Sequence, residues 1–479
     1  MRVLCVDIGT SRAKAAVYRD HPSGVPERVS LVSRLARAVR TDGRVDLDLL
    51  RQDLLELLGS AAAETPLEKL DALAVTCIYG HVLTDHRQLP CGPGLAWNFD
   101  PGPVARSRLD RRFGPTVDGA WGDALRGPGP DTLATRLAWL AAGRPHEYAA
   151  AVQIAGLKDW LIACLTGVWA ADPTLRDYLG APPDQLSALC EEAGIQPVDE
   201  ESPLARAGSL LPGPAAGCGL RPGIPVIRAC TDGSAAMYGL GVLAPGLVTA
   251  VTGSTDVVMT ETPRRPERPA EAGGGATRSA VGTWLRGGST ASSGAAIHWL
   301  DELLAPAGRS WWEVAPGSEG VVAGAGLGGE RAPFQQATPA FLRGLRAGHD
   351  GAVLQRAMRE AVCMRFSLLV GGLAAPGARR LVVGGGSQEA ASPGEAALEK
   401  LRASLSPLPM ERARDRQSSL LGLALLAFSA LDPGDPRDVL RRRSLAVAEH
   451  TEPVPDDAGL REQYADLMPE WRQGMEGDA

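Results

Sequence analysis

Short apolar runs and segments with helical spacing alternate along the whole chain. Apolar runs that predict buried strands, some of them ending in turns, lie at residues 3–11, 70–75, 224–230, 247–255 and 381–383. Segments whose residue pattern predicts helices lie at residues 46–63, 131–142, 157–165, 234–241, 349–370 and 417–431. Because strands and helices that alternate in this way build sheets covered by helices, the pattern predicts an α/β fold.

Two of the strand-like runs end in similar turns about half a chain apart. The first reads Asp7-Ile8-Gly9-Thr10-Ser11, and the second ends in Thr252-Gly253-Ser254-Thr255. The chain becomes apolar again after each turn, so each run predicts a hairpin. Glycine allows the backbone to approach a ligand closely, and hydroxyl and free N–H groups hold phosphate oxygens. The two hairpins predict two like-built lobes, residues 1–245 and 246–479, with a phosphate-bearing ligand between them.

Two aspartates at strand ends are candidates for chemistry. Asp7 could hold its turn through a side-chain hydrogen bond, or it could hold Mg²⁺, which prefers oxygen ligands and waters. Asp232 follows the run at 224–230 and could cap the helix that begins there. It could also accept a hydroxyl proton during phosphoryl transfer, a contribution of about 10²–10⁴ in rate. From position alone, both interpretations stay open for each aspartate.

Glycine-rich segments give one further candidate and exclude two nucleotide motifs. Gly384-Gly385-Gly386-Ser387 follows a strand, which favours a flat ligand or a close backbone, although a plain tight turn fits as well. Residues 324–329 match a dinucleotide fingerprint, but the Glu-Arg-Ala-Pro that follows does not open a helix. None of the four lysines has the glycine spacing of a Walker A motif. Residues 261–276, rich in proline, arginine and glycine, predict an exposed loop.

Composition narrows the class of protein. A chain of 479 residues predicts two or three domains, and its net charge of −7 without a basic stripe disfavours nucleic acid and anionic membranes as partners. The eight cysteines form no Cys-x-x-Cys pair and the seven histidines no metal-binding pair, which disfavours a zinc site. The chain starts directly with a strand-like run, and the late apolar stretch at 420–431 is too short to span a bilayer. We therefore expect a cytoplasmic protein.

Taken in order, these motifs resemble those of the FGGY carbohydrate kinases, and those of xylulokinases in particular. The first hairpin with Lys14 resembles the phosphate hairpin of that family, residues 231–236 its catalytic-base segment, and residues 253–255 its Gly-Thr-Ser turn. Further similar segments lie at residues 134–140, 158–161, 165–167, 172–174, 294–300, 329–333 and 384–387.

The resemblance implies an actin-like, ribonuclease-H-like fold, with ATP between the lobes and a sugar or polyol against the first lobe. It implies that Asp232 is the catalytic base and that Asp7 positions Mg²⁺. The residues expected to bind ATP are Thr10, Ser11, Lys14, Gly253, Ser254, Thr255, Gly294, Gly384, Gly385, Gly386 and Ser387. A small-molecule acceptor and a homodimer are the partners that we expect.

Two segments depart from the family pattern where the family contacts its acceptor. Cys77-Ile78-Tyr79-Gly80-His81 stands in place of Gly-Gln-Met-His-Gly, and Trp97-Asn98-Phe99-Asp100-Pro101 in place of Trp-x-Asp-x-Arg. Gln417 also stands where a glutamate is frequent, near the adenosine site. Because a site built to bind a hydroxyl group discriminates strongly, changed partners imply a changed acceptor. The candidate acceptor-binding residues are Tyr79, Gly80, His81, Trp97, Asn98 and Asp232.

The sequence therefore favours an ATP-dependent kinase that acts on an unusual sugar, cyclitol or other polyhydroxy acceptor. The altered acceptor segments also allow a catalytically silent protein that senses a sugar or nucleotide on the same scaffold. A different ATP-dependent transferase is a third hypothesis.

Overall fold

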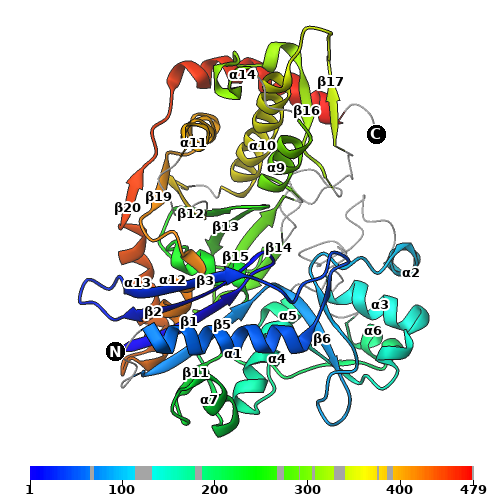
Figure 1. Cartoon of the computed structure of the whole chain (residues 1–479), viewed down its shortest axis with the longest axis vertical. Coiled ribbons are helices and arrows are strands. Elements are labelled where there is room, and N and C mark those ends of the chain that lie inside the picture. The colour runs from blue at the N-terminus through cyan, green and yellow to red at the C-terminus, as the bar shows by residue number, and fades with distance from the viewer. Residues whose placement is uncertain are drawn as a thin grey trace.

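Two β-sheets form the centres of two lobes that lie one above the other along the long axis of the molecule (Figure 1). The computed structural model describes residues 1–64, 70–113, 132–177, 186–266, 275–290, 292–304, 308–327, 340–374, 377–385 and 392–476. The first sheet contains, in order, β10 (Arg206–Ser209), β11 (Pro225–Ile227), β5 (Ala72–Cys77), β1 (Arg2–Ile8), β2 (Arg12–Arg19) and β3 (Glu27–Leu35). The second contains β14 (Gly275–Arg278), β15 (Trp284–Ser289), β13 (Asp256–Thr262), β12 (Leu247–Thr252), β18 (Arg380–Gly385), β19 (Met410–Ala413) and β20 (Thr451–Pro453).

Both sheets are built around the same three-stranded unit. In the first sheet β1 pairs antiparallel with β2 and parallel with β5. In the second sheet β12 pairs antiparallel with β13 and parallel with β18. The two predicted hairpins therefore occupy equivalent places in the two lobes. This repeated unit, in a mixed α/β chain, confirms the predicted two-lobed fold class.

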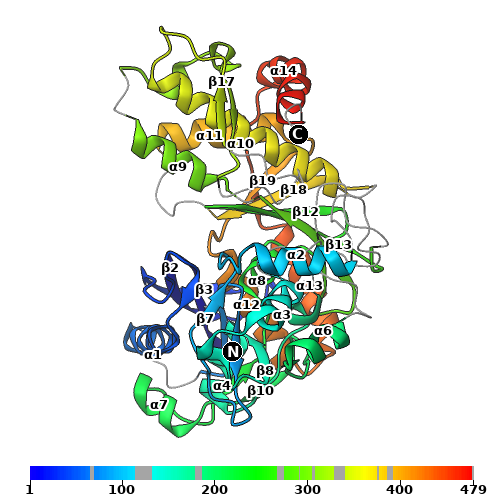
Figure 2. The same ribbon diagram turned by 90° about the vertical axis from the view of Figure 1, so that its right-hand side faces the viewer.

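Helices cover these sheets, and two smaller sheets extend the lobes (Figure 2). The first lobe carries α1 (Leu47–Glu64), α4 (Leu157–Thr166), α5 (Thr174–Asp177) and α7 (Pro212–Cys218). A five-stranded sheet lies beside it, made of β4 (Arg44–Val45), β7 (Gly94–Ala96), β6 (Gly80–Thr84), β8 (Gln153–Gly156) and β9 (Gln196–Pro197). With it lie α2 (Pro103–Phe113), α3 (Leu133–Gly143), α6 (Leu186–Ala193) and the short helix His146–Tyr148.

The second lobe carries the remaining covering helices at the far end of the molecule. They are α9 (Gly294–Leu303), α10 (Gly351–Leu373), α11 (Pro393–Leu405), α14 (Ala458–Glu476) and two short helices, Trp311–Glu313 and Ser318–Gly320. The two-stranded sheet of β16 (Val322–Gly324) and β17 (Phe341–Arg343) lies among them. In the part of the chain that the structure describes, no helix is long and apolar enough to cross a membrane.

Three further helices join the lobes: α8 (Asp232–Gly239), α12 (Ser418–Leu431) and α13 (Pro436–Ala448). The first two cross backbone to backbone, because a Cβ added at Gly239 would lie 1.9 Å from the carbonyl oxygen of Ser418. A Cβ added at Gly422 would lie 1.7 Å from the carbonyl oxygen of Ala235. Buried residues of both helices share one hydrophobic core with strands of the first sheet. The two central sheets fall on either side of the predicted boundary at 245/246, which stays a prediction.

Most of the predicted elements appear close to their predicted residues, but two differ. The apolar run at 224–230 forms a strand only over Pro225–Ile227, because the next residues turn, with Ala229 at a φ of 52°. The predicted loop at 261–276 is wrong at both ends, since β13 runs to Thr262 and β14 begins at Gly275. Both strands pair with β15. Residues 267–274 lie outside the described residues.

Candidate active site

Asp7 lies near the end of β1, opposite Lys14 on β2. Its Oδ2 accepts a hydrogen bond of 2.5 Å from Ser419 Oγ of α12, which comes from the other half of the chain. Its Oδ1 is buried and has no hydrogen-bond partner among the described residues. Burial raises the pKa of Asp7, whereas the Ser419 hydroxyl and the charge of Lys14 lower it. The free oxygen is thus available to a ligand.

Asp232 is the first residue of α8, and Thr231 before it is the N-cap residue. The alternative role of Asp232 as the cap is therefore wrong. Its Oδ1 accepts a hydrogen bond of 2.8 Å from the N–H of Gly233. Burial, followed by the negative charge of Asp7, raises the pKa of Asp232 to about 7. A carboxylate with this pKa is suited to take a proton near neutral pH.

In each predicted phosphate turn, the N–H of the glycine donates to a carbonyl oxygen that follows it in the chain. The N–H of Gly9 donates to the carbonyl oxygen of Arg12 at 2.9 Å, and that of Gly253 to Thr255 at 3.1 Å. Because a backbone hydrogen bond closes each turn, the hydroxyl side chains after each glycine are not required to close it. Thr10, Ser11, Gly253 and Ser254 are exposed, while Lys14 and Thr255 are half-buried.

The second turn is braced by the start of α9. The N–H of Gly294 donates to the carbonyl oxygen of Gly253 at 2.9 Å, and a Cβ on Gly294 would lie 2.5 Å from that oxygen. Asp256, directly after the turn, is fully buried and accepts a 2.6 Å hydrogen bond from Ser293 Oγ. Arg402 lies 3.4 Å from the same carboxylate. Sequence reasoning missed this support, although an aspartate directly after a Gly-Ser-Thr turn was a signal.

A cavity of about 530 Å³ opens next to this turn in the second lobe. Its volume lies within the usual range for small-molecule sites. It is lined by Gly294, Ile297, His298 and Asp301 of α9, by Gln355 and Arg359 of α10, by Ser392, Pro393, Gly394, Glu395 and Leu398, and by Ser310, Trp311 and Trp312. The aromatic pair and the polar groups suit a base and a ribose.

Among the described glycines that the resemblance predicts to bind ATP, one lies at this cavity. Gly294 lines it, whereas Gly384 and Gly385 are not among its lining residues. A Cβ on Gly384 would lie 2.7 Å from Leu240 Cδ2, and one on Gly385 would lie 2.3 Å from the carbonyl oxygen of Thr252. These two glycines therefore serve close packing at the end of β18. Gly386 and Ser387 lie outside the described residues.

The residues of the first altered acceptor segment differ in their burial. Tyr79 and Gly80 line a second, smaller cavity, but His81 is fully buried in β6. The Tyr79 hydroxyl and His81 Nε2 lie 3.4 Å apart, so His81 supports Tyr79 and does not itself line the cavity. A Cβ on Gly80 would lie 2.4 Å from the carbonyl oxygen of Leu95, which explains the glycine by packing.

The second predicted acceptor segment lies beside the first phosphate turn. Trp97 Nε1 donates to Thr10 Oγ1 at 3.4 Å, and Asn98 is exposed. Arg136, which is fully buried, holds the backbone of this segment. Its guanidinium group donates to the carbonyl oxygens of Ala96 and Phe99 at 2.8 and 3.0 Å. Arg136 lies in the segment 134–140 that resembles the family, but the sequence pattern alone indicates no role for it.

The smaller cavity also contains charges that sequence reasoning left without a role. Lys158, Asp159, Asp172 and Thr231 line it together with Tyr79. Lys158 Nζ lies 2.5 Å from Asp159 Oδ1 and 3.3 Å from Asp172 Oδ1. Burial lowers the pKa of Lys158, but the two carboxylates outweigh it and raise the pKa. A lysine beside an aspartate in an otherwise apolar helix pattern was the available signal. Since Thr231 precedes Asp232, the cavity lies next to the candidate base.

The second half of the chain has a known counterpart. Residues 248–431 match the C-terminal domain of the FGGY family of carbohydrate kinases. A xylulose kinase from Streptomyces coelicolor is 29% identical over 442 residues, which cover 88% of this chain and 88% of that protein. Residues 248–431 therefore form a C-terminal domain of the FGGY carbohydrate-kinase type. FGGY kinases use ATP, which confirms the expected phosphoryl donor.

Solved structures share the fold of this chain over nearly all of its length. A gluconate kinase from Lactobacillus acidophilus matches with a TM-score of 0.80 and 16% identity, over 99% of this chain and 98% of that chain. A glycerol kinase from Plasmodium falciparum, solved with ADP, matches with a TM-score of 0.76 and 14% identity, over 99% of this chain and 98% of that chain. At such identities the likeness shows the fold alone.

Proposed function

We propose that this protein transfers the γ-phosphoryl group of ATP to a hydroxyl group of a polyhydroxy acceptor, with Asp232 as the general base. The observation that carries the proposal is the carboxylate of Asp232, whose pKa is raised to about 7 by burial and by the charge of Asp7, next to a small cavity that Lys158 and Asp159 line. The acceptor hydroxyl would give its proton to Asp232 as its oxygen attacks the γ-phosphorus. Catalysis of this kind rests mainly on positioning and charge stabilisation.

Asp7 fits a magnesium ligand, because its buried Oδ1 has no partner among the described residues. In these residues no group of three or more His, Cys, Asp or Glu side chains is arranged to hold a metal. Magnesium at a nucleotide site usually takes only one or two carboxylates, and its other ligands are phosphates and waters. When bound, the ion would neutralise phosphate charge. Asp7 would hold it, and Ser419 would orient the carboxylate of Asp7 through Oδ2.

The ATP molecule would extend from the 530 Å³ cavity to the two phosphate turns. The nucleoside would occupy the cavity beside Gly294 and the Trp311–Trp312 pair, whose ring centroids lie 5.8 Å apart. The β- and γ-phosphates would meet the turn at Gly253–Thr255 and the exposed hydroxyls of Thr10 and Ser11. Lys14 would supply positive charge from β2.

The smaller cavity has a volume of about 10 Å³, which is room for about one water. The acceptor would therefore bind at its mouth, against Tyr79, Gly80 and Thr231. Here Tyr79 presents a hydroxyl group that His81 orients from within the core. Trp97 and Asn98 would contact the acceptor from the side of the first phosphate turn. These groups support an acceptor other than the common ketopentose of xylulose kinases, because the donors and acceptors in the pocket differ from the family pattern.

A coupled assay of ADP release over a broad panel of sugars, polyols and cyclitols tests the proposal. We expect turnover with at least one acceptor, and a loss of about 10²-fold or more in Asp232→Ala. Equal turnover by the wild type and Asp232→Ala with every acceptor would contradict the role of Asp232. Binding of ATP in a calorimeter, without turnover of any acceptor, would favour the alternative of a silent sensor.

A cytoplasmic location and a homodimer stay predictions of the sequence. Light scattering of the purified protein would test the homodimer, since a mass of one chain would contradict it.

A further inference from the structure

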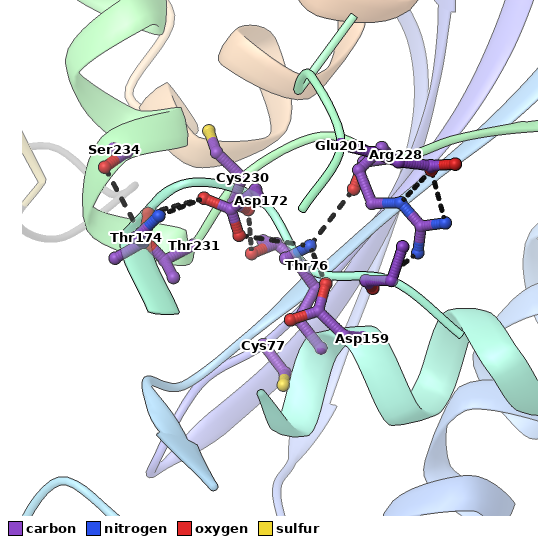
Figure 3. Close-up of polar contacts among 12 residues, drawn as sticks. Thr76, Cys77, Asp159, Asp172, Thr174, Glu201, Arg228, Cys230, Thr231 and Ser234 are labelled. Atoms are coloured by element: carbon purple, nitrogen blue, oxygen red, sulfur yellow. Dashed lines mark hydrogen bonds and ion pairs between the residues drawn. The ribbon is translucent and has the colours of Figure 1, made fainter. Parts of the chain in front are cut away.

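The segment that leads from β11 to Asp232 is held by buried donors from two other elements. Lys158 of α4 donates from Nζ to the carbonyl oxygen of Arg228 at 3.2 Å. Thr76 of β5 donates from Oγ1 to the carbonyl oxygen of Cys230 at 2.8 Å. The Lys158 side chain is 3% exposed, and Thr76 is fully buried. Figure 3 shows Thr76 and Asp159 beside the segment from Arg228 to Thr231.

Between the two held carbonyl groups lies a residue in an unfavourable backbone conformation. Ala229 is fully buried and has a φ of 52°, which non-glycine residues adopt only at an energetic cost. Such a conformation persists where the surroundings over-determine it, and it is typical of functional sites. Here its N–H also donates to the carbonyl oxygen of Pro203 at 2.9 Å. The chain is therefore forced to turn at this point, three residues before Asp232.

Lys158 is held by two carboxylates that line the smaller cavity. Its ammonium group pairs with Asp159 and Asp172, and Asp172 accepts a further 2.5 Å hydrogen bond from Thr174 Oγ1. Both carboxylate residues line the cavity that Thr231 also lines. In a buried cluster these bonds are strengthened by the low local dielectric. The cluster thus connects the acceptor pocket to the segment that carries the base.

We propose that Thr76 and Lys158 are positioning residues, which hold residues 228–231 and thereby aim the carboxylate of Asp232 at the acceptor hydroxyl. The inference rests on the proposed role of Asp232. A misplacement of about 1 Å by a mutation remote from the chemistry can cost about 10²-fold in rate. Because neither residue lines the nucleotide cavity, the loss of a hydrogen bond should lower kcat and leave the binding of ATP unchanged.

Thr76→Val tests the inference, since it keeps the shape of the buried side chain and removes its hydroxyl. We expect kcat to fall about 10-fold or more while the KM for ATP changes less than about twofold. Thr76→Ser should restore kcat, because it restores the donor. The matched control is Thr260→Val, since Thr260 is a buried residue of β13 whose Oγ1 donates to the carbonyl oxygen of Leu247 at 3.0 Å. The Thr260→Val variant should lose about as much stability as Thr76→Val and should keep the kcat of the wild type.

Hydrogen exchange of the peptide that spans residues 226–236 gives a second readout, which needs no acceptor. Exchange should accelerate in Thr76→Val and stay at the wild-type rate in Thr76→Ser and Thr260→Val. The inference is overturned by unchanged exchange in Thr76→Val, or by an equal loss of kcat in Thr76→Val and Thr260→Val. A wild type without turnover on any acceptor would contradict the proposed function alone, and the exchange data would still decide the inference.

Discussion

Asp7 and Asp232 are two carboxylates in one site, and their surroundings give them different chemistry. Asp7 receives a hydrogen bond from Ser419 and keeps one buried oxygen free, which suits a cation ligand. Asp232 is buried away from solvent and lies within reach of the negative charge of Asp7, and both effects raise its pKa to about 7. Paired titratable groups whose environments differ in this way are typical of acid–base sites.

The activity should depend on the protonation of Asp232. Since the base must be deprotonated, kcat/KM for the acceptor should rise with pH through a pKa near 7 and then level off. Initial rates at constant ionic strength from about pH 5 to about pH 9 would show this limb. A flat profile over this range, with acceptor binding intact, would contradict the assignment.

The same shift predicts how stability depends on pH. Because the pKa of Asp232 in the folded chain lies near 7, above its ordinary value of 3.8, its contribution to stability is full below about pH 4 and is lost as the pH rises through 7. Asp232→Asn removes this loss. Urea unfolding should therefore show a greater gain in the free energy of unfolding for Asp232→Asn at about pH 8 than at about pH 5. An equal effect at both values would show that the group does not titrate in this way.

At the scale of elements, the crossing of α8 and α12 fixes the positions of Asp232 and Ser419 relative to each other. Glycines allow this crossing, because Gly239 and Gly422 bring the two backbones into contact. The helices come from distant parts of the chain, and both pack in the core under the first sheet. Asp232 begins the first helix, and Ser419 lies in the first turn of the second.

Gly422→Ala should destabilise the protein, because the added methyl group would overlap the carbonyl oxygen of Ala235. Overpacking of this kind costs about 1–3 kcal/mol or more. Gly371→Ala in α10 is the matched control, since the nearest atom to its Cβ would be 3.9 Å away. Replacing a helical glycine that has room should add about 0.5 kcal/mol of stability. Chemical denaturation measures both changes, and equal effects would contradict the close crossing.

Local patterns predicted the elements better than they predicted the roles of single residues. The hairpins could be predicted because apolar runs and glycine turns are local signals, and both turns formed where the sequence placed them. His81 could not be separated from Tyr79 by pattern, because its burial depends on the packing of β6. Gly384 and Gly385 are explained by contacts with Leu240 and Thr252, which come from elsewhere in the chain.

At the scale of the whole molecule, the site depends on contacts between the two halves of the chain. Asp7 and Ser419 are 412 positions apart and form a direct hydrogen bond. Tyr18 of β2 donates to Asp415, and Arg278 of β14 pairs with Asp177 at the end of α5. The hydrophobic pattern along a chain carries no information about pairs of residues that lie this far apart. The sequence therefore predicted two lobes but not the contacts between them. Closure of the lobes around ATP and acceptor would exclude water from the reacting groups.

The central claim is that Asp232 serves phosphoryl transfer and not nucleotide binding. The most direct measurement is the mass of the product formed from an active acceptor by the wild type and by Asp232→Asn, with ATP binding measured by calorimetry on both proteins. We predict one added phosphoryl group with the wild type, a product yield lower by about 10²-fold or more with the variant, and similar ATP affinities. Equal product formation by both proteins, or transfer of a group other than phosphoryl, would contradict the account.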